Sequence, residues 1–272
     1  MNQCSITGYT KAVVDSLGTL RVLSTDKFGQ MDANQWTNVK AVVAGDYHVS
    51  ALLSNGTVKT TRGSVSSGWD EAEASRWQNI KAIAASDDHL VALRDDGTVV
   101  AMGNNYDEQC EVAAWRDVVA VAATEGASAG LRKNGKVIAT SGCYCDWEDL
   151  NSYGDIVAMS MGRSHIVALR SNGTVVAAGD NEYEECDTSW WRGITAVAAG
   201  SYHTIGLRED GTVVAVGYND DGQCEVGSWN RIVDIHCCGN ITMGLRADGK
   251  ILYCGCVDDD DMERLFPEGK LR

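Results

Sequence analysis

Glycines recur along the chain at an almost constant spacing, and this periodicity constrains the fold more than any other feature of the sequence. Neighbouring members of the series are 38 residues apart, except that 41 residues separate Gly56 from Gly97. The series is Gly18, Gly56, Gly97, Gly135, Gly173, Gly211 and Gly249. A fixed period of this length indicates tandem structural repeats. We therefore divide the chain into seven repeats, at residues 1–38, 39–79, 80–117, 118–155, 156–193, 194–231 and 232–272.

Each repeat has the pattern of short strands joined by turns. In residues 80–117, apolar segments at 80–85, 89–94 and 98–103 are separated by a polar loop and by the turn at Asp96-Gly97, and the segment 109–112 follows a second loop. Asn-Gly and Asp-Gly pairs favour tight hairpins, because these turns need positive φ. We predict four antiparallel strands in each repeat and no helices.

One such small sheet cannot bury both of its faces, so the sheets must stack on one another until the ring closes. The predicted fold is therefore an all-β, seven-bladed β-propeller of four-stranded blades. We expect residues 1–272 to form a single domain.

The composition is that of a globular protein with an acidic surface. Hydrophobic residues make up 44% of the chain, and the formal net charge is −15. Such a surface repels phosphate backbones, so the expected partner is a protein with a basic or mixed surface and not a nucleic acid. Without a signal-like start or a membrane-length apolar segment, we expect a cytoplasmic monomer that binds no membrane and keeps its ten cysteines reduced.

The repeat also resembles a known family. The pattern A-A-G-x-x-H-T-x-x-L-R-x-D-G-T-V-x-x-x-G-x-N-x-x-G-Q, which runs from Ala198 to Gln223, is similar to the regulator of chromosome condensation repeat. The short repeats are closest to compact bacterial members of that family, such as β-lactamase inhibitory proteins. The resemblance implies a propeller but no single activity, because the family also includes a nucleotide exchange factor for a small GTPase and a plant photoreceptor. The G-W-R-H-T motif of the photoreceptor is absent.

Residues that recur in most repeats are expected to serve the fold. Four histidines stand eight residues before their turn glycine; a metal-binding ring is the alternative, but we expect each to tie down loop backbone. These are His48, His89, His165 and His203. The recurring tryptophans are expected to pack in the core. These are Trp36, Trp77, Trp115, Trp191 and Trp229.

Seven of the ten cysteines form two groups, and Cys143 and Cys145 stand close together in the fourth repeat. Cys110, Cys186 and Cys224 occupy equivalent positions and are expected to behave as small hydrophobes. The last repeat holds a further group, for which a zinc site is the alternative. This group is His236, Cys237, Cys238, Cys254 and Cys256. Because it contains no paired C-x-x-C motifs, we predict neither a metal nor a cofactor.

The loops between the first and second strands and those after the third strand should emerge at one face of the propeller. Seven of the nine tyrosines fall in these loops, with many acidic residues around them. Rigid, amphipathic tyrosines beside charged residues are typical of protein-binding surfaces. The predicted binding residues are Tyr47, Asp88, Tyr106, Asp107, Tyr144, Tyr183, Tyr202, Tyr218 and Asp220, and the loops also hold the acidic run 258–261.

No catalytic motif is present: the chain has no phosphate-binding glycine loop, nucleophile elbow or H-E-x-x-H sequence. We therefore predict a non-enzymatic propeller that presents an acidic, tyrosine-rich loop face to a protein partner, which it could inhibit. The alternative is a regulator of a small GTPase that acts like a guanine nucleotide exchange factor.

Overall fold

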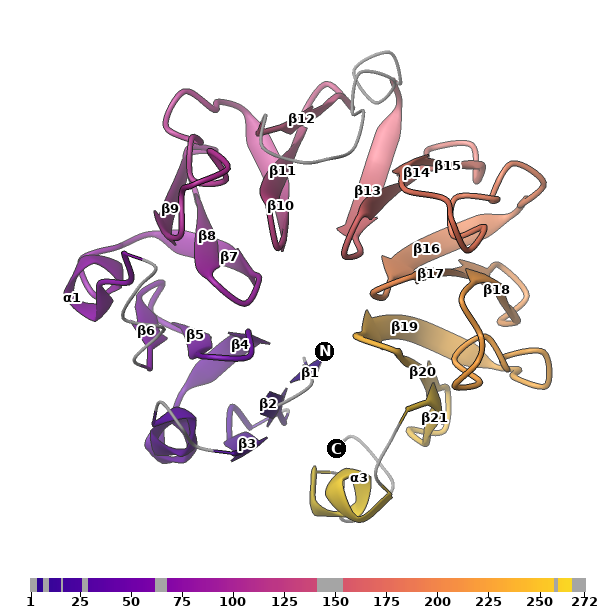
Figure 1. Ribbon diagram of the computed structural model, residues 1–272, viewed down its shortest axis with the longest axis horizontal. Helices are drawn as coiled ribbons and strands as arrows, with labels where there is room; N and C mark the ends of the chain where they lie inside the picture. The colour runs from indigo at the N-terminus through magenta and orange to yellow at the C-terminus, as the bar shows by residue number, and fades with distance from the viewer. Residues whose placement is uncertain are drawn as a thin grey trace. The chain divides into compact units, whose positions relative to one another are not determined.

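A computed structural model describes residues 4–6, 10–15, 17–25, 29–61, 68–140, 154–256 and 259–265. These residues form seven antiparallel sheets, each made of three strands that are consecutive in the chain (Figure 1). The chain divides into two compact units, residues 1–133 with 138–143, and residues 134–137 with 144–272. Each unit is described by itself below.

The first unit holds four sheets, the last of which ends at the boundary between the units. Their strands are β1 (Cys4–Ile6), β2 (Thr10–Val14), β3 (Leu20–Ser24), β4 (Val39–Ala44), β5 (Val49–Leu53), β6 (Val58–Thr60), β7 (Ile80–Ala85), β8 (His89–Arg94), β9 (Val99–Gly103), β10 (Val118–Thr124), β11 (Ala127–Arg132) and β12 (Val137–Ala139). The first strands of neighbouring sheets contact one another, β1 with β4, β4 with β7 and β7 with β10. The sheets of this unit therefore stack in chain order.

The second unit repeats this arrangement with three sheets. Their strands are β13 (Ile156–Met161), β14 (His165–Arg170), β15 (Val175–Gly179), β16 (Ile194–Ala199), β17 (His203–Arg208), β18 (Val213–Gly217), β19 (Ile232–Cys238), β20 (Ile241–Arg246) and β21 (Ile251–Gly255). Contacts again join the first strands, β13 with β16 and β16 with β19. Sheets stacked through their first strands are the blades of a β-propeller, so the predicted fold class is confirmed, with seven sheets as its blades.

The glycine turns form the hairpins between the second and third strands, as predicted. At Gly97, φ is 82°, a value that glycine adopts without steric strain and that residues with a Cβ rarely adopt. The preceding Asp96 fixes the turn, because its Oδ1 accepts hydrogen bonds from the backbone N–H of Thr98 at 2.9 Å and from the hydroxyl of Thr98 at 2.6 Å. Asn55, Asn172 and Asp210 form the same pair of bonds in their own turns.

The prediction of a fourth strand in each repeat is wrong for the described residues. Residues 109–112 form no strand, because their N–H groups bond locally: those of Glu111 and Val112 donate to the carbonyls of Glu108 and Cys110. The N–H of Cys110 donates to Oδ1 of Asn105 at 2.8 Å, and Nδ2 of Asn105 donates to Glu111 at 2.9 Å. Glu108 adopts a φ of 62°, which bends the chain out of an extended path. The same asparagine clamp recurs at Asn181 and Asn219.

The prediction that the chain has no helices is also wrong. The structure contains a 3-10 helix, η1 (Gln30–Gln35), and the α-helices α1 (Glu71–Ala74) and α3 (Asp259–Leu265). The predicted loop run 258–261 is therefore corrected: residue 258 lies outside the described residues, and 259–261 form the start of α3. Acidic residues suit a helix start because they complement the helix dipole. Met262 and Leu265, both buried, anchor the helix.

The recurring tryptophans pack between the sheets. Trp77, Trp115, Trp191 and Trp229 are buried, and Trp36 packs at the edge of a core cluster. Close approach demands glycine where the Trp191 ring meets the next sheet: a Cβ on Gly206 would lie 2.6 Å from that ring. No helix among the described residues is long and apolar enough to cross a membrane.

Candidate functional site

A recurring backbone hydrogen bond holds two loops together at the same edge in several of the sheets. The residue after the third strand donates its N–H to the carbonyl of the residue before the second strand, as Tyr218 does to Tyr202 at 2.9 Å. The same bond joins Asp180 to Ser164 and, in the first unit, Asn104 to Asp88. The loops that carry the predicted binding residues therefore lie side by side within each of these sheets.

Three of the predicted tyrosines form a contiguous cluster in the second unit. The ring of Tyr183, in the loop after β15, contacts two others edge to face. The centroid distances are 5.5 Å to Tyr202, between β16 and β17, and 5.2 Å to Tyr218, after β18. Such edge-to-face pairs are a favourable arrangement of aromatic rings. We call these three residues the tyrosine cluster. Its central ring, Tyr183, is 41% exposed.

Arg163 contacts the tyrosine cluster from the sheet that also carries Tyr183. It lies in the loop between β13 and β14, and its Nη1 donates to the phenol oxygen of Tyr202 at 3.0 Å. Its guanidinium carbon lies 5.9 Å from the centre of the Tyr202 ring, within the range of a cation–π contact. The backbone N–H of Arg163 also donates to the carbonyl of Ser201 at 3.2 Å. Loops from two sheets are thus fastened to each other at the tyrosine cluster.

Carboxylates border the cluster on the side of Tyr218. Asp220 and Asp221 are exposed, and Asp221 accepts a hydrogen bond from Nδ2 of Asn240 at 3.0 Å. Partial desolvation and these two negative charges raise the pKa of Tyr218, so its phenol stays neutral. Asp180 and Glu182, also exposed, precede Tyr183. The cluster therefore combines apolar ring faces with negative charge.

Four other predicted residues lie in the first unit. Tyr106 and Asp107, after β9, are exposed, and the Tyr106 side chain is 86% exposed. Tyr47, in the loop between β4 and β5, is partly exposed, and Asp88, between β7 and β8, is half-buried. None of the interactions described for the tyrosine cluster involves these four. Tyr144 lies outside the described residues.

Acidic groups of neighbouring loops interact in the first unit. The N–H of Asp46 donates to Oδ1 of Asp87 at 2.8 Å. Burial, with the nearby charges of Asp46, Glu125 and Asp88, raises the pKa of Asp87 to about 6. Burial also raises the pKa of Asp88. This part of the surface consequently carries less negative charge at mildly acidic pH than its composition suggests.

Three segments of the chain that end in these loops match a known repeat family. A family profile for the regulator of chromosome condensation (RCC1) repeat matches residues 80–109, 156–185 and 194–223. Each match runs from the start of a first strand to the loop after the third strand. These three segments of the chain are RCC1-type repeats.

Solved structures show the same fold at low sequence identity. The CRINKLY WD40 ectodomain of the Arabidopsis thaliana receptor kinase ACR4 has a TM-score of 0.72 and 12% identity, over 94% of this chain and 94% of that one. Prp20p from Saccharomyces cerevisiae has a TM-score of 0.66 and 17% identity, over 97% and 84%. The Physcomitrella patens receptor kinase CR4 ectodomain has a TM-score of 0.71 and 15% identity, over 93% and 72%. A search of curated protein sequences finds no match.

The histidines of the RCC1 repeat join neighbouring blades. Nε2 of His165 lies 2.8 Å from Oγ1 of Thr204, and Nε2 of His203 lies 2.8 Å from Oγ1 of Thr242. Each threonine hydroxyl donates to a backbone carbonyl, so it must accept the proton of the imidazole Nε2. Burial lowers the pKa of both histidines to about 4. The predicted structural role is correct, although the acceptor is here a hydroxyl on the next blade.

In the first unit His89 follows this pattern through Ser128, and His48 bonds directly to the Ser86 carbonyl at 2.9 Å. Burial again lowers the pKa, to about 3 for His89 and about 4 for His48. All four histidines are fully buried and neutral, which makes them parts of the blade contacts and unsuited to binding a ligand at the surface.

The three cysteines at equivalent positions contact the loops after the third strands. The thiols of Cys110 and Cys186 each lie 3.3 Å from a backbone carbonyl just after the third strand, and Cys224 lies 3.5 Å from that of Tyr218. Burial raises the pKa of Cys110 and Cys224 to about 12, so these thiols stay protonated.

The cysteines of the last repeat do not converge on one point. Cys237 is buried beside Thr242, whereas Cys238 pairs with His236, its Sγ 3.6 Å from Nε2. Burial raises the pKa of Cys237, which disfavours the thiolate that a metal would need. Within the described ranges, no three His, Cys, Asp or Glu side chains could hold a metal ion together.

Glu185 is the site residue that the sequence reasoning missed. It is fully buried below the tyrosine cluster, and its Oε2 accepts the backbone N–H of Tyr183 at 2.9 Å. Glutamine occupies the equivalent position at Gln109 and Gln223, where it accepts the same bond. The signal was visible in the aligned repeats, as a charged residue in place of a neutral one.

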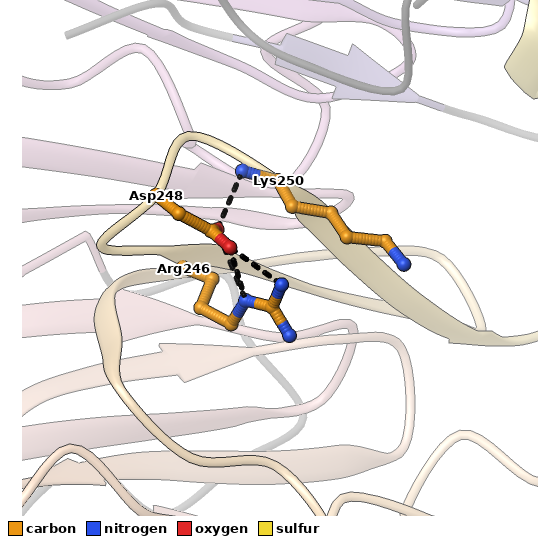
Figure 2. A network of polar contacts seen from close by, with 3 residues as sticks. All are labelled: Arg246, Asp248 and Lys250. Carbon is orange, nitrogen blue, oxygen red and sulfur yellow. Dashed lines mark hydrogen bonds and ion pairs between the residues drawn. The ribbon is translucent and has the colours of Figure 1, made fainter.

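The opposite edge of the last blade has its own polar network (Figure 2). The guanidinium of Arg246 forms a bidentate ion pair with Asp248, which also accepts the N–H of Lys250 at 3.1 Å. The Arg246 guanidinium lowers the pKa of Asp248. In other repeats a threonine at the position of Lys250 gives its hydroxyl to the turn carboxylate or amide. In the last repeat the Arg246 guanidinium takes the place of this hydroxyl as donor to the turn carboxylate. We therefore interpret the network as part of the hairpin turn and not as a binding site.

Proposed function

We propose that this chain is a non-enzymatic propeller that binds a protein partner through the tyrosine cluster. The observation that carries the proposal is the contact of the Tyr183 ring with Tyr202 and Tyr218 at loops of two neighbouring blades, braced by Arg163 from the blade of Tyr183. Those loops are fastened to one another by backbone bonds, so the rings are held in place before a partner arrives.

Preorganised tyrosines suit protein recognition on physical grounds. A tyrosine offers a large amphipathic contact area and loses little side-chain entropy, because only two χ angles must be fixed. Here part of that entropy is already lost in the ring contacts of the free protein, which reduces the cost of binding. The exposed phenols can also donate hydrogen bonds across an interface.

The charges beside the cluster favour a partner with a basic or mixed surface. Asp180, Glu182, Asp220 and Asp221 are exposed around the rings, and the whole chain carries a formal charge of −15. Such a field speeds encounter with basic surfaces and disfavours acidic ones. The propeller of Prp20p, whose structure was reported with its binding to Gsp1p and histones, offers a precedent for protein partners on this fold.

Site-specific photo-crosslinking tests the proposal. A photoreactive phenylalanine derivative replaces Tyr183 in one variant and Trp190 in another, an exposed aromatic residue of the same unit outside the cluster. We expect a discrete crosslinked protein from position 183 in cells and none from position 190. The crosslink at 183 should weaken when Asp220 and Asp221 are changed to asparagine. Equal crosslinking from both positions would contradict the proposal.

A further inference from the structure

The buried glutamate below the tyrosine cluster has one oxygen that finds no partner. Glu185 is fully buried, and its Oε2 is occupied by the N–H of Tyr183. Its Oε1 is buried without a hydrogen bond. An ionised carboxylate with an unsatisfied buried oxygen carries a desolvation cost, so this oxygen needs an explanation.

Other repeats show what stands at this position. Nε2 of Gln30 donates to the carbonyl of Asp46 at 3.1 Å, and Nε2 of Gln109 donates to that of Glu125 at 3.4 Å, in both cases sixteen residues further on in the next blade. Gln223, in the sixth repeat, keeps only the local bond. In the first and third repeats the glutamine amide thus ties one blade's outer loop to the first loop of the next blade.

The same spacing counted from Glu185 leads to Ser201, the residue before Tyr202. A glutamate can make the bridge to the Ser201 carbonyl only as a neutral acid, because a carboxylate offers acceptors alone. When Glu185 is ionised, its Oε1 would face the Ser201 carbonyl oxygen, and the two acceptors would repel each other. If the spacing of the other repeats holds here, the carboxyl proton decides whether this bridge between the two loops can form.

We propose that Glu185 is a positioning residue of the tyrosine cluster, which ties the Tyr183 loop to the Tyr202 loop when its carboxyl is protonated and releases the Tyr202 loop when it is ionised. This inference rests on the proposed function, because it assigns a control to the same surface. Ionised Glu185 would keep its bond to the Tyr183 N–H, but the Tyr202 loop would keep only the bonds from Arg163, from Tyr218 and to Gly239, and no tie to the Glu185 carboxyl.

The surroundings of Glu185 favour the neutral acid. Burial and the charges of Asp180 and Glu182 raise its pKa, opposed by its backbone hydrogen bonds. From the next blade, Thr204 donates its hydroxyl to the Glu185 carbonyl, and His165 behind it is neutral. Arg163 turns its guanidinium to Tyr202 and its N–H to Ser201. The charged groups that act most strongly on this carboxyl, Asp180 and Glu182, are both acidic.

The test compares the full chain with Glu185→Gln, which restores the residue of the other repeats, and with Glu182→Gln, which removes a neighbouring charge. Urea denaturation is followed between pH 4 and 8. We expect Glu185→Gln to raise the folding equilibrium constant about tenfold at pH 8 and to have little effect at pH 4, since a raised carboxyl pKa costs stability only above it. Equal or lower stability of Glu185→Gln at pH 8 would overturn the proposal.

A second readout follows the tyrosines themselves. Fluorotyrosine labelling and ¹⁹F NMR, with Tyr202→Phe for assignment, should show the Tyr202 signal shifting with pH in the wild type and in Glu182→Gln, but not in Glu185→Gln. A shift that persists in Glu185→Gln would contradict the assignment. Neither measurement needs a partner, so failure here leaves the crosslinking test of the proposed function unaffected, and the reverse also holds.

Discussion

Nε2 of His165 lies 2.8 Å from the hydroxyl of Thr204, a residue of the next blade. The hydroxyl in turn donates to the backbone carbonyl of Glu185 at 2.8 Å. One chain of hydrogen bonds thus runs from the core of one blade through its neighbour to the loop that carries Tyr183. Recurring residues hold the blades together, and the loops they support hold the candidate site.

Removing the hydroxyl of Thr204 should destabilise the second unit. In Thr204→Val the shape is kept, but the imidazole N–H and the Glu185 carbonyl both lose a buried partner, at a cost of about 2–4 kcal/mol. Thr204→Ser, which keeps the hydroxyl, should cost less. Chemical denaturation measures both variants, and equal losses for the two would show that the hydroxyl is unimportant.

Acid should destabilise the protein through the buried histidines. Their pKa values are lowered to about 3–4 in the folded chain and are near 6.5 when unfolded, so the unfolded state binds the extra protons. The stabilisation is therefore complete above pH 6.5 and lost as pH falls towards 4. Histidine NMR should show His165 and His203 still neutral at pH 5. Protonation of either one near pH 6.5 would refute the assignment.

Asp87→Asn should stabilise the first unit at neutral pH. The pKa of Asp87 is raised to about 6, so ionisation of its carboxyl lowers the free energy of unfolding as pH rises from about 4 to about 6. The loss then stays constant at higher pH. Asparagine keeps the oxygen that accepts the Asp46 N–H but carries no charge. We expect a gain of about 1–2 kcal/mol at pH 7.5, after allowance for partial solvent screening, and no gain at pH 4. A gain that is independent of pH would point to another cause.

Gly200→Ala should disrupt the contact between blades. An added Cβ would lie 2.1 Å from Cε1 of His203 and 2.7 Å from the carbonyl oxygen of Gly239, so the ring or the backbone must move. Overpacking of this kind costs about 1–3 kcal/mol or more. Gly227→Ala is the matched control, since nothing lies within 4 Å of its added Cβ. Thermal unfolding should separate the two variants clearly, and similar melting temperatures would count against the packing described.

Sequence reasoning found the blades because their determinants are local and repeated. The hairpins follow from Asp-Gly and Asn-Gly turns, which need nothing beyond neighbouring residues. The prediction of a fourth strand was wrong because Asn105, Asn181 and Asn219 accept backbone N–H groups that would otherwise pair with a neighbouring strand. The alternation of polar and apolar residues does not reveal these side-chain bonds. The helix α3 was missed because its acidic start resembles a solvated loop.

The candidate site was partly accessible from topology. The expectation that first and outer loops share a face put Tyr183, Tyr202 and Tyr218 on one face, but it did not predict that their rings would touch or that Arg163 would brace them. Glu185 differs from the glutamine of equivalent repeats by a single group. Its importance depends on burial, which the sequence does not display.

The most direct test of the central claim measures affinity for the protein captured by the crosslink at position 183. Isothermal titration compares the wild type with the triple variant Tyr183→Ala, Tyr202→Ala, Tyr218→Ala and with Trp190→Ala. Aromatic residues at the centre of an interface are worth about 2 kcal/mol or more each, so the triple variant should bind at least about 100-fold more weakly. Trp190→Ala should bind within about threefold of the wild type. Unchanged affinity in a folded triple variant would contradict the account.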